Sequence, residues 1–229
     1  IALRGGLVSK LRRLSAGMWA RLLLLGLLFY AVTQGAQFLS LAYLPATTAS
    51  LLLSFTTVLV ALLGILFLGE RPAAMQWAGT GFYRAGVAVY FYPRALSGGE
   101  GIGLLVAGAG VVANALSSIL GRDVNRRGEL DPMGVTLVSM GFGAAVLLAG
   151  GVAVQGPPRL APGHWAIILW LAVVNTALAF TLWNHTLRTL SAMESSIINN
   201  TMLFQIALLA WLFLGQPLGW RQVAGMVLA

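Results

Sequence analysis

The sequence is 229 residues long; 59% of its residues are hydrophobic, only 9% are charged, and the formal net charge is +8. Soluble globular domains carry about 25% charged residues, so this composition excludes an ordinary water-soluble globule and indicates a chain that lies in lipid. The basic residues lie in short gaps between apolar runs, which marks them as topology signals rather than as a nucleic-acid surface. The absence of cysteine excludes a disulfide, a thiolate nucleophile and a cysteine metal site.

Apolar stretches of near-bilayer length follow one another along the whole chain. A transmembrane helix needs about 20 mainly apolar residues, and each stretch must be helical because an open strand edge would leave backbone groups unpaired in lipid. We predict spans at 22–43, 46–68, 74–92, 102–121, 133–154, 165–187 and 194–214, with an eighth that begins at 220. Since the eighth stretch reaches only about half the length of a span, we expect the sequence to be a fragment.

The gaps between the spans indicate where helices start and how the chain is oriented in the membrane. Proline lies near several predicted helix starts, for example at Asp131-Pro132, where its missing N–H costs little. Ten basic residues lie in one set of alternate gaps, and three lie in the other set (Arg94, Arg159 and Arg221). Because cytoplasmic loops carry an excess of Lys and Arg, the first set is predicted to be cytoplasmic: Arg4, Lys10, Arg12, Arg13, Arg21, Arg71, Arg122, Arg126, Arg127 and Arg188.

The second half of the chain repeats part of the first half. Residues 190–225 match 44–79 without a gap, with 13 identities in 36 positions, and the phrase FLGE that ends at Glu70 returns as FLGQ at Gln216. The match pairs the second predicted span with the seventh. Five crossings separate these spans, so the two copies run in opposite directions through the membrane. Inverted repeats of this kind are typical of secondary transporters, in which two equivalent halves exchange inward-open and outward-open shapes.

The repeated segments carry marks of a known family. The stretch from Phe38 to Val87 resembles the first repeat of the EamA family in the drug/metabolite transporter superfamily, and the stretch from Leu190 to Gly225 resembles the second. The marks in the first repeat are Ala42-Tyr43-Leu44, the small-residue run 46–50, Gly69-Glu70-Arg71, Gln76 with Gly79, and Gly86-Val87. Gln216, where the family usually has Glu, and Asn199-Asn200-Thr201, where a Pro is common, depart from the pattern.

The resemblance implies an all-α membrane protein, an inverted-repeat transmembrane helix bundle with five plus five spans in the full family fold, about eight of them visible here. It divides the chain into a first EamA repeat at 1–92, truncated at its N-terminus, and a second at 93–229, truncated at its C-terminus. It also implies a multi-pass protein of the bacterial inner (plasma) membrane. The expected partners are a small-molecule substrate and the lipid bilayer, with no nucleic acid, as a monomer or a homodimer.

Several uncharged polar side chains lie deep within the predicted spans. Tyr30, Gln34 and Gln37 fall on one helical face, because they are spaced four and three residues apart. Polar groups are expensive in lipid and normally face partners or a cavity. The candidate substrate-binding residues are Tyr30, Gln34, Gln37, Ser54, Asn114, Asn175, Trp183, Asn184, Asn199 and Asn200. The alternative for each is an interhelical hydrogen bond, which contributes about 0.6 kcal/mol.

The charged residues give no sign of catalysis. All six acidic residues lie at span ends or in gaps (Glu70, Glu100, Asp123, Glu129, Asp131 and Glu194), so we predict no catalytic residue, metal site or cofactor. A phosphate-binding lysine motif is also missing, which argues against ATP hydrolysis. Glu70 is expected to cap the third span. Arg84 lies roughly 15 Å from the inner end of that span, either to bind an anionic substrate group or as a buried or snorkelling Arg.

Two further expectations follow. Gly108, Gly110, Gly141 and Gly143 are predicted to allow close helix packing. For the function, the leading hypothesis is a permease that exports or exchanges small metabolites, either amino-acid-like or drug-like, by alternating access. The alternatives are an intramembrane enzyme that acts on a lipid-linked substrate, which needs an acid, His or Ser constellation at one depth, and a passive channel, which predicts flux without saturation.

Overall fold

The computed structural model describes residues 6–44, 49, 52–53, 55–91, 101–157, 160–214, 219–221 and 223–224. These residues form helices and turns, and no strand occurs among them, in agreement with the predicted all-α class. The chain folds into two compact units: unit 1 comprises 1–32 and 120–190, and unit 2 comprises 33–119 and 191–229. Each unit draws residues from both sides of position 92, and the division into two sequence repeats at that position stays a prediction.

Four helices in the described part of the chain are long and apolar enough to cross a membrane. They are Ala16–Tyr43, Gly101–Arg127, Pro132–Gln155 and Pro162–Thr186, which overlap the predicted spans at 22–43, 102–121, 133–154 and 165–187. Thr56–Leu68 forms a shorter apolar helix within the predicted span 46–68.

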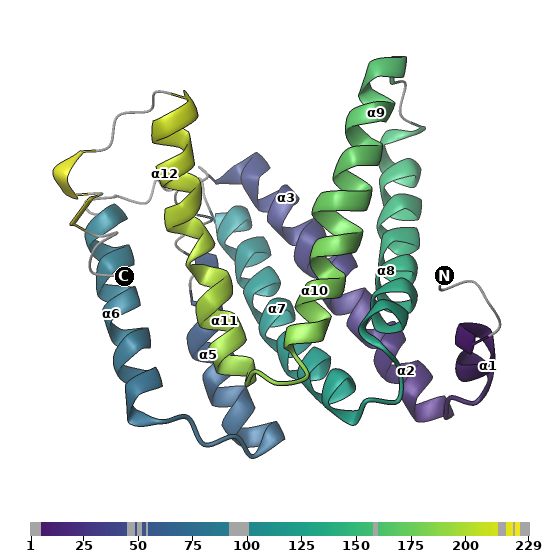
Figure 1. Ribbon diagram of the computed structural model, residues 1–229. Helices are drawn as coiled ribbons and strands as arrows, with labels where there is room; N and C mark the ends of the chain where they lie inside the picture. The colour runs from purple at the N-terminus through teal and green to yellow at the C-terminus, as the bar shows by residue number, and fades with distance from the viewer. Residues whose placement is uncertain are drawn as a thin grey trace. The chain divides into compact units, whose positions relative to one another are not determined.

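Unit 1 is built around α8 (Pro132–Gln155), which packs against α2 (Ala16–Leu25) and α10 (Ala179–Thr186). Figure 1 shows α8 and α10 side by side. The unit also contains α1 (Gly6–Arg12), α9 (Pro162–Trp170) and the last turns of α7 (Gly101–Arg127). Its apolar core consists of Met18, Leu22, Leu25, Val124, Leu130 and Val135.

The contact between α8 and the segment after α2 depends on two glycines. A Cβ added at Gly26 would clash with the backbone of Ser139, and one added at Gly143 would clash with the backbone of Gly26 and lie 2.7 Å from Cβ of Tyr30. The prediction of close packing is therefore confirmed for Gly143. In unit 2 a Cβ at Gly110 would lie 3.0 Å from Cβ of Ala36, whereas Gly108 and Gly141 have nothing within 4 Å among the described residues.

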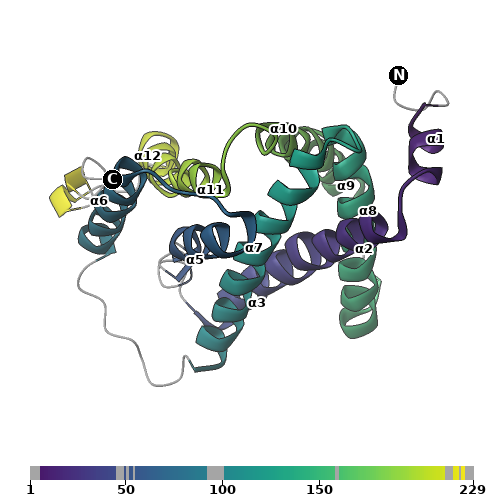
Figure 2. The ribbon, with the colours of Figure 1, turned by 90° about the horizontal axis from the view of Figure 1, so that it is seen from below.

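Unit 2 is organised around α11 (Ala192–Asn200), which continues through Thr201 into α12 (Met202–Leu214). α11 packs against α5 (Thr56–Leu63) and α6 (Ala74–Phe91), and both views show α5 and α11 as neighbours (Figures 1 and 2). The unit also contains α3 (Gln34–Tyr43) and the first part of α7. Val60, Ala115, Ile119 and Ala192 form its buried apolar core.

In the part of the chain that the structure describes, three segments are wound as π-helix: η1 (Gly26–Thr33), η2 (Gly64–Leu68) and η3 (Leu171–Leu178). A π-helix bonds residue i to i+5, so it holds more residues per turn than an α-helix. Residues on either side of such a segment therefore do not share the helical face that α-helical spacing predicts for them. Two of the segments contain candidate residues, Tyr30 and Asn175.

Local sequence explains several helix starts. The side chain of Asp131 accepts a hydrogen bond from the N–H of Gly134 (2.9 Å), with Pro132 in the first turn of α8, which confirms the expected helix start at Asp131-Pro132. Ser15 caps α2 in the same way, with 3.2 Å from the N of Met18 to Oγ. Such caps bond backbone N–H groups that have no partner inside the helix.

Candidate functional site

The structure divides the predicted substrate-binding residues between the two units. Unit 1 contains Tyr30, Asn175, Trp183 and Asn184, and unit 2 contains Gln34, Gln37, Asn114, Asn199 and Asn200. Ser54 lies outside the described residues. The arrangement can be described within each unit, and one site made from the whole set stays a prediction.

In unit 1, Asn184 is the centre of a buried polar network that joins three helices. Its Nδ2 donates to Oγ1 of Thr136 on α8 (2.9 Å) and to the carbonyl of Phe180 (3.0 Å), and its Oδ1 accepts from Nδ2 of Asn125 on α7 (2.8 Å). Asn184, Asn125 and Thr136 are all buried. Because these bonds use both ends of the amide, the network ties the helices together, as the alternative interpretation of the intramembrane amides expects.

Tyr30 lies beside this network and inside an aromatic cluster. Its ring is 5.0 Å from the ring of Phe180 and 5.0 Å from that of Phe29, centroid to centroid. Its hydroxyl is within hydrogen-bonding reach of Asn184 and Ser139. Buried tyrosines usually find such a partner for the hydroxyl, so Tyr30 joins the apolar core of unit 1 to its polar network.

Asn175 and Trp183 lie on the helix Pro162–Thr186. Within the described residues the most apolar window of this helix has no buried member, Asn175 is exposed and Trp183 is half-buried. An amide at the middle of a span is costly if it faces lipid. The surface around Asn175 is therefore suited to a water-filled cavity or to a polar partner.

The unit 2 candidates are more open to their surroundings. Gln34 and Asn114 are half-buried, and Gln37 and Asn199 are exposed; Asn200 is the last residue of α11. The hydroxyls of Ser117 and Ser118 donate to the carbonyl of Asn114 at 2.8 and 2.9 Å. The two serines therefore bond the backbone of their own helix.

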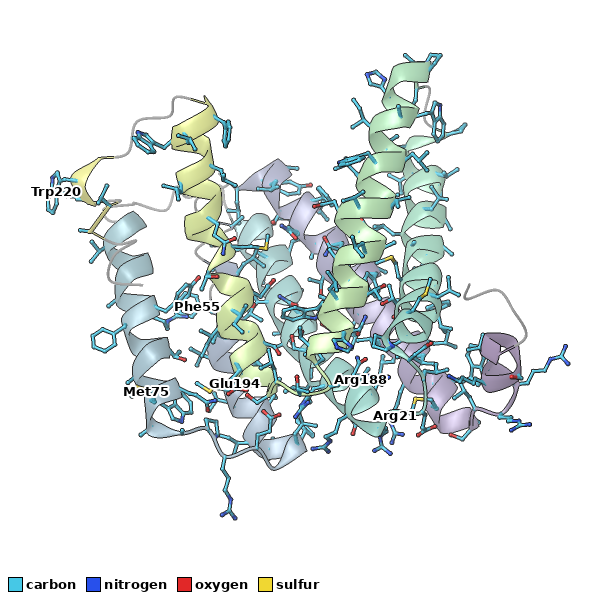
Figure 3. The ribbon with its side chains drawn as sticks, viewed as in Figure 1. Arg21, Phe55, Met75, Arg188, Glu194 and Trp220 are labelled. Carbon is cyan, nitrogen blue, oxygen red and sulfur yellow. The ribbon has the colours of Figure 1, made fainter. Side chains whose placement is uncertain are left out.

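A polar cluster that sequence reasoning missed holds the first turn of α11. Both carboxylate oxygens of Glu70 lie 3.2 Å from the N of Ala192. Glu194 forms a capping box with Ser191, and its Oε1 accepts from Nε2 of Gln76 at 2.9 Å. We call these four side chains, Glu70, Gln76, Ser191 and Glu194, the α11 junction; Figure 3 shows Glu194 at this end of α11.

The junction corrects the expected role of Glu70, because its carboxylate caps α11 from a position 122 residues away in sequence. At the third span, Oε1 of Gln76 accepts from the N of Ala73 at 2.9 Å and so caps the start of α6. One turn further into α11, Oγ of Ser196 donates to Oγ1 of Thr57 at 3.2 Å.

Arg84, halfway along α6, stacks on an aromatic ring of the same unit. Its guanidinium carbon lies 3.6 Å from the centroid of the Phe55 ring, and Figure 3 labels Phe55. A cation over an aromatic face is attracted by the ring quadrupole. This contact gives the intramembrane Arg a local partner, which supports the buried or snorkelling interpretation over a role in substrate binding.

Comparison with known proteins identifies the kind of protein to which this geometry belongs. The sequence model of the EamA-like transporter family matches residues 2–92 and 101–229. This chain belongs to the EamA-like transporter family. A solved structure titled "Crystal structure of protein" has the same fold, with a TM-score of 0.75 and 20% sequence identity over 96% of this chain and 75% of that one. The search of curated proteins found no match.

As an EamA-like transporter family member with four apolar helices of membrane-spanning length, the chain is a multi-pass membrane protein. Among the described residues, no group of three or more His, Cys, Asp or Glu side chains could hold a metal ion.

Within the α11 junction, Ser191 and Glu194 match the S-x-x-E pattern of a capping box, a sequence signal for the start of α11. The internal repeat contains the other two residues, Glu70 and Gln76. Their partners in α11 lie more than 100 residues away, and no local pattern identifies them.

Proposed function

We propose that this EamA-like chain acts as a secondary transporter of the bacterial inner membrane that exports or exchanges small metabolites, either amino-acid-like or drug-like, by alternating access. The observation that carries the proposal is the family match, which extends over nearly the whole chain in two stretches, 2–92 and 101–229. Two matches to one family are the expected signature of two equivalent halves.

The packing of α11 against α5 supports an inverted relation between those halves. Thr57 bonds Ser196, while Val60, further along α5, shares a core with Ala192, at the start of α11. The two helices therefore run antiparallel. α5 and α11 belong to the second and seventh predicted spans, which the internal repeat pairs, and a twofold axis in the membrane plane places paired spans in opposite directions.

The π-helical segments give independent support. η1 begins at Gly26 and η3 begins at Leu171, 145 residues later, and both contain eight residues. This distance is within one residue of the offset of the sequence repeat. Both segments lie outside the 36 positions in which the repeat was found, so sequence and local structure point separately to the same pairing of helices.

The α11 junction suggests how one face closes. Glu70 to Ala192, Gln76 to Glu194 and Thr57 to Ser196 all join α11 to the α5–α6 segment. Movement of α11 away from α5 and α6 would break these bonds and open this end. Hydrogen bonds contribute about 0.5–1.5 kcal/mol each, or 1.5–3 kcal/mol when one group is charged. Their sum matches the few kcal/mol that separate states in a protein that switches readily.

The test is transport by the full-length protein in liposomes. We expect saturable uptake of a radiolabelled solute from a panel of amino acids and hydrophobic cations, and faster uptake when the same unlabelled solute is trapped inside, since an alternating-access carrier exchanges solutes. Protein-free liposomes are the control. Flux that rises linearly with concentration and shows no exchange would indicate a channel, and no flux for any solute in the panel would count against transport of these classes.

A further inference from the structure

We infer that the end of unit 1 that carries Arg21, Arg126 and Arg127 is a binding site for the phosphate headgroup of an anionic phospholipid. The three guanidinium groups converge on one carboxylate, that of Asp123. Nε of Arg127 lies 3.0 Å from Oδ2, Nε of Arg21 lies 3.6 Å from Oδ2, and Nη2 of Arg126 lies 3.8 Å from Oδ1. We call the three arginines the Arg triad; Arg21 comes from α2 and the other two from the last turn of α7.

The Arg triad keeps an excess of positive charge and of hydrogen-bond donors. Asp123 offsets one of the three positive charges and the nearby Glu129, which interacts with Arg127, at most one more, so a positive charge remains. Of the Asp123 contacts, only that of Arg127 is also a hydrogen bond. Each guanidinium has five N–H donors, while a carboxylate has about four acceptor sites. The arginine side chains are 40–47% exposed and that of Asp123 is 18% exposed. The carboxylate is therefore more buried than the arginines, which stay accessible to a ligand.

Phosphate is the group that this arrangement fits. Its oxygens match the planar donor fork of arginine, which binds phosphate through two parallel hydrogen bonds. A site for a carboxylate would need fewer donors than the triad provides. Because the triad is held together by Asp123 before any ligand arrives, little side-chain entropy is lost on binding.

The position of the triad favours a lipid over a soluble phosphate compound. Arg21 directly precedes the predicted span 22–43 (Figure 3 shows it near the start of α2), and Arg126 and Arg127 follow the predicted span 102–121, which places the triad at headgroup level on the side predicted to be cytoplasmic. One turn deeper on α2, Leu24 is 47% exposed and can contact an acyl chain. Clusters of basic residues next to a span attract anionic lipids.

The experiment measures lipid binding by the purified full-length protein in neutral detergent, from the shift in unfolding temperature as phosphatidylglycerol is added. Removing two triad charges, in Arg126→Gln/Arg127→Gln, should weaken the apparent affinity about 100-fold, since the charge-assisted hydrogen bonds of each arginine to the phosphate contribute about a tenfold factor. The matched control is Arg13→Gln/Arg71→Gln, which removes two exposed charges from the same predicted side but outside the triad; we expect less than a threefold change. If the double variant does not fold, Arg126→Gln alone should show about a tenfold loss.

Each remaining outcome decides against a specific part of the proposal. Equal losses in the triad and control variants would mean general charge attraction and would overturn the site. If inorganic phosphate raised the unfolding temperature as much as phosphatidylglycerol does, the assignment to a lipid would be overturned. If phosphatidylcholine did so, the assignment to an anionic lipid would be overturned. A triad that only holds α2 to α7 predicts a lower unfolding temperature without lipid and an unchanged lipid shift.

Discussion

Replacement of Glu70 tests whether the α11 junction controls the opening of one face of the protein. Glu70→Ala removes the carboxylate that caps Ala192, together with its charge at the N-terminus of α11. Loss of a capping side chain costs about 1 kcal/mol, and loss of a negative charge at a helix N-terminus costs about 0.3–1 kcal/mol. We therefore expect the closed state of this face to lose about 1.5 kcal/mol. Glu70→Gln keeps an oxygen acceptor and should lose less than half of that.

The assay uses an introduced thiol, since the chain has no cysteine of its own. Ser195 is buried in the first turns of α11, and within the described residues its hydroxyl has no hydrogen-bond partner, so Ser195→Cys is a mild change. A water-soluble maleimide reaches this thiol only when the junction opens. A change of 1.4 kcal/mol is tenfold in an equilibrium, so Glu70→Ala should raise the labelling rate of Cys-substituted Ser195 about tenfold in proteoliposomes.

The matched control is Glu129→Ala, which removes an exposed acidic residue from unit 1 and should leave the labelling rate unchanged. Circular dichroism of each variant before labelling shows whether the fold is intact. An unchanged rate in Glu70→Ala would refute the reasoning, because the cap would then make no difference to opening. An equal rise in Glu129→Ala would refute it as well, since the effect would come from net charge and not from the junction.

Two predictions concern the stability of unit 1, measured as the free energy of unfolding of the purified protein in detergent. Asn184→Ala removes the bonds to Asn125 and Thr136, two buried partners on α7 and α8, and should cost about 1–3 kcal/mol; Asn175→Ala, at an exposed position, should change stability by less than about 0.5 kcal/mol, and equal effects would contradict the network. Gly143→Ala places a methyl group against the backbone of Gly26 and should cost about 1–3 kcal/mol. Gly141→Ala has open space and should be neutral or stabilising, so a loss there would show that close packing is not the cause.

The sequence predicts the positions of the long helices well because their lengths are set by the bilayer. Apolar runs of about 20 residues are unambiguous, and the start at Asp131-Pro132 is local chemistry that needs no tertiary structure. The family is likewise evident from marks such as Gly69-Glu70-Arg71, which lie in the gaps between helices.

The side-chain partners were beyond the reach of the sequence. Glu70 was expected to cap the nearest helix, but its carboxylate bonds α11, because the turn after η2 directs it there; Gly69, with φ of 64°, makes that turn. α-Helical spacing predicts that Tyr30, Gln34 and Gln37 share one helical face. The π-helical segment η1 changes the angle between successive side chains, and in the structure Tyr30 is buried and Gln37 is exposed. A π-helical segment has no sequence pattern from which it could be predicted.

The matched π-helical segments have a mechanical consequence. A π turn is an α turn with one extra residue, so its conversion to α-helix would rotate the residues that follow by about 100° and advance them by about 1.5 Å. No covalent bond changes in such a conversion, and the backbone N–H groups of the segment exchange i−5 partners for i−4 partners. η1 lies in the first predicted sequence repeat and η3 in the second, and Tyr30 and Asn175 are among the residues that such conversions would turn.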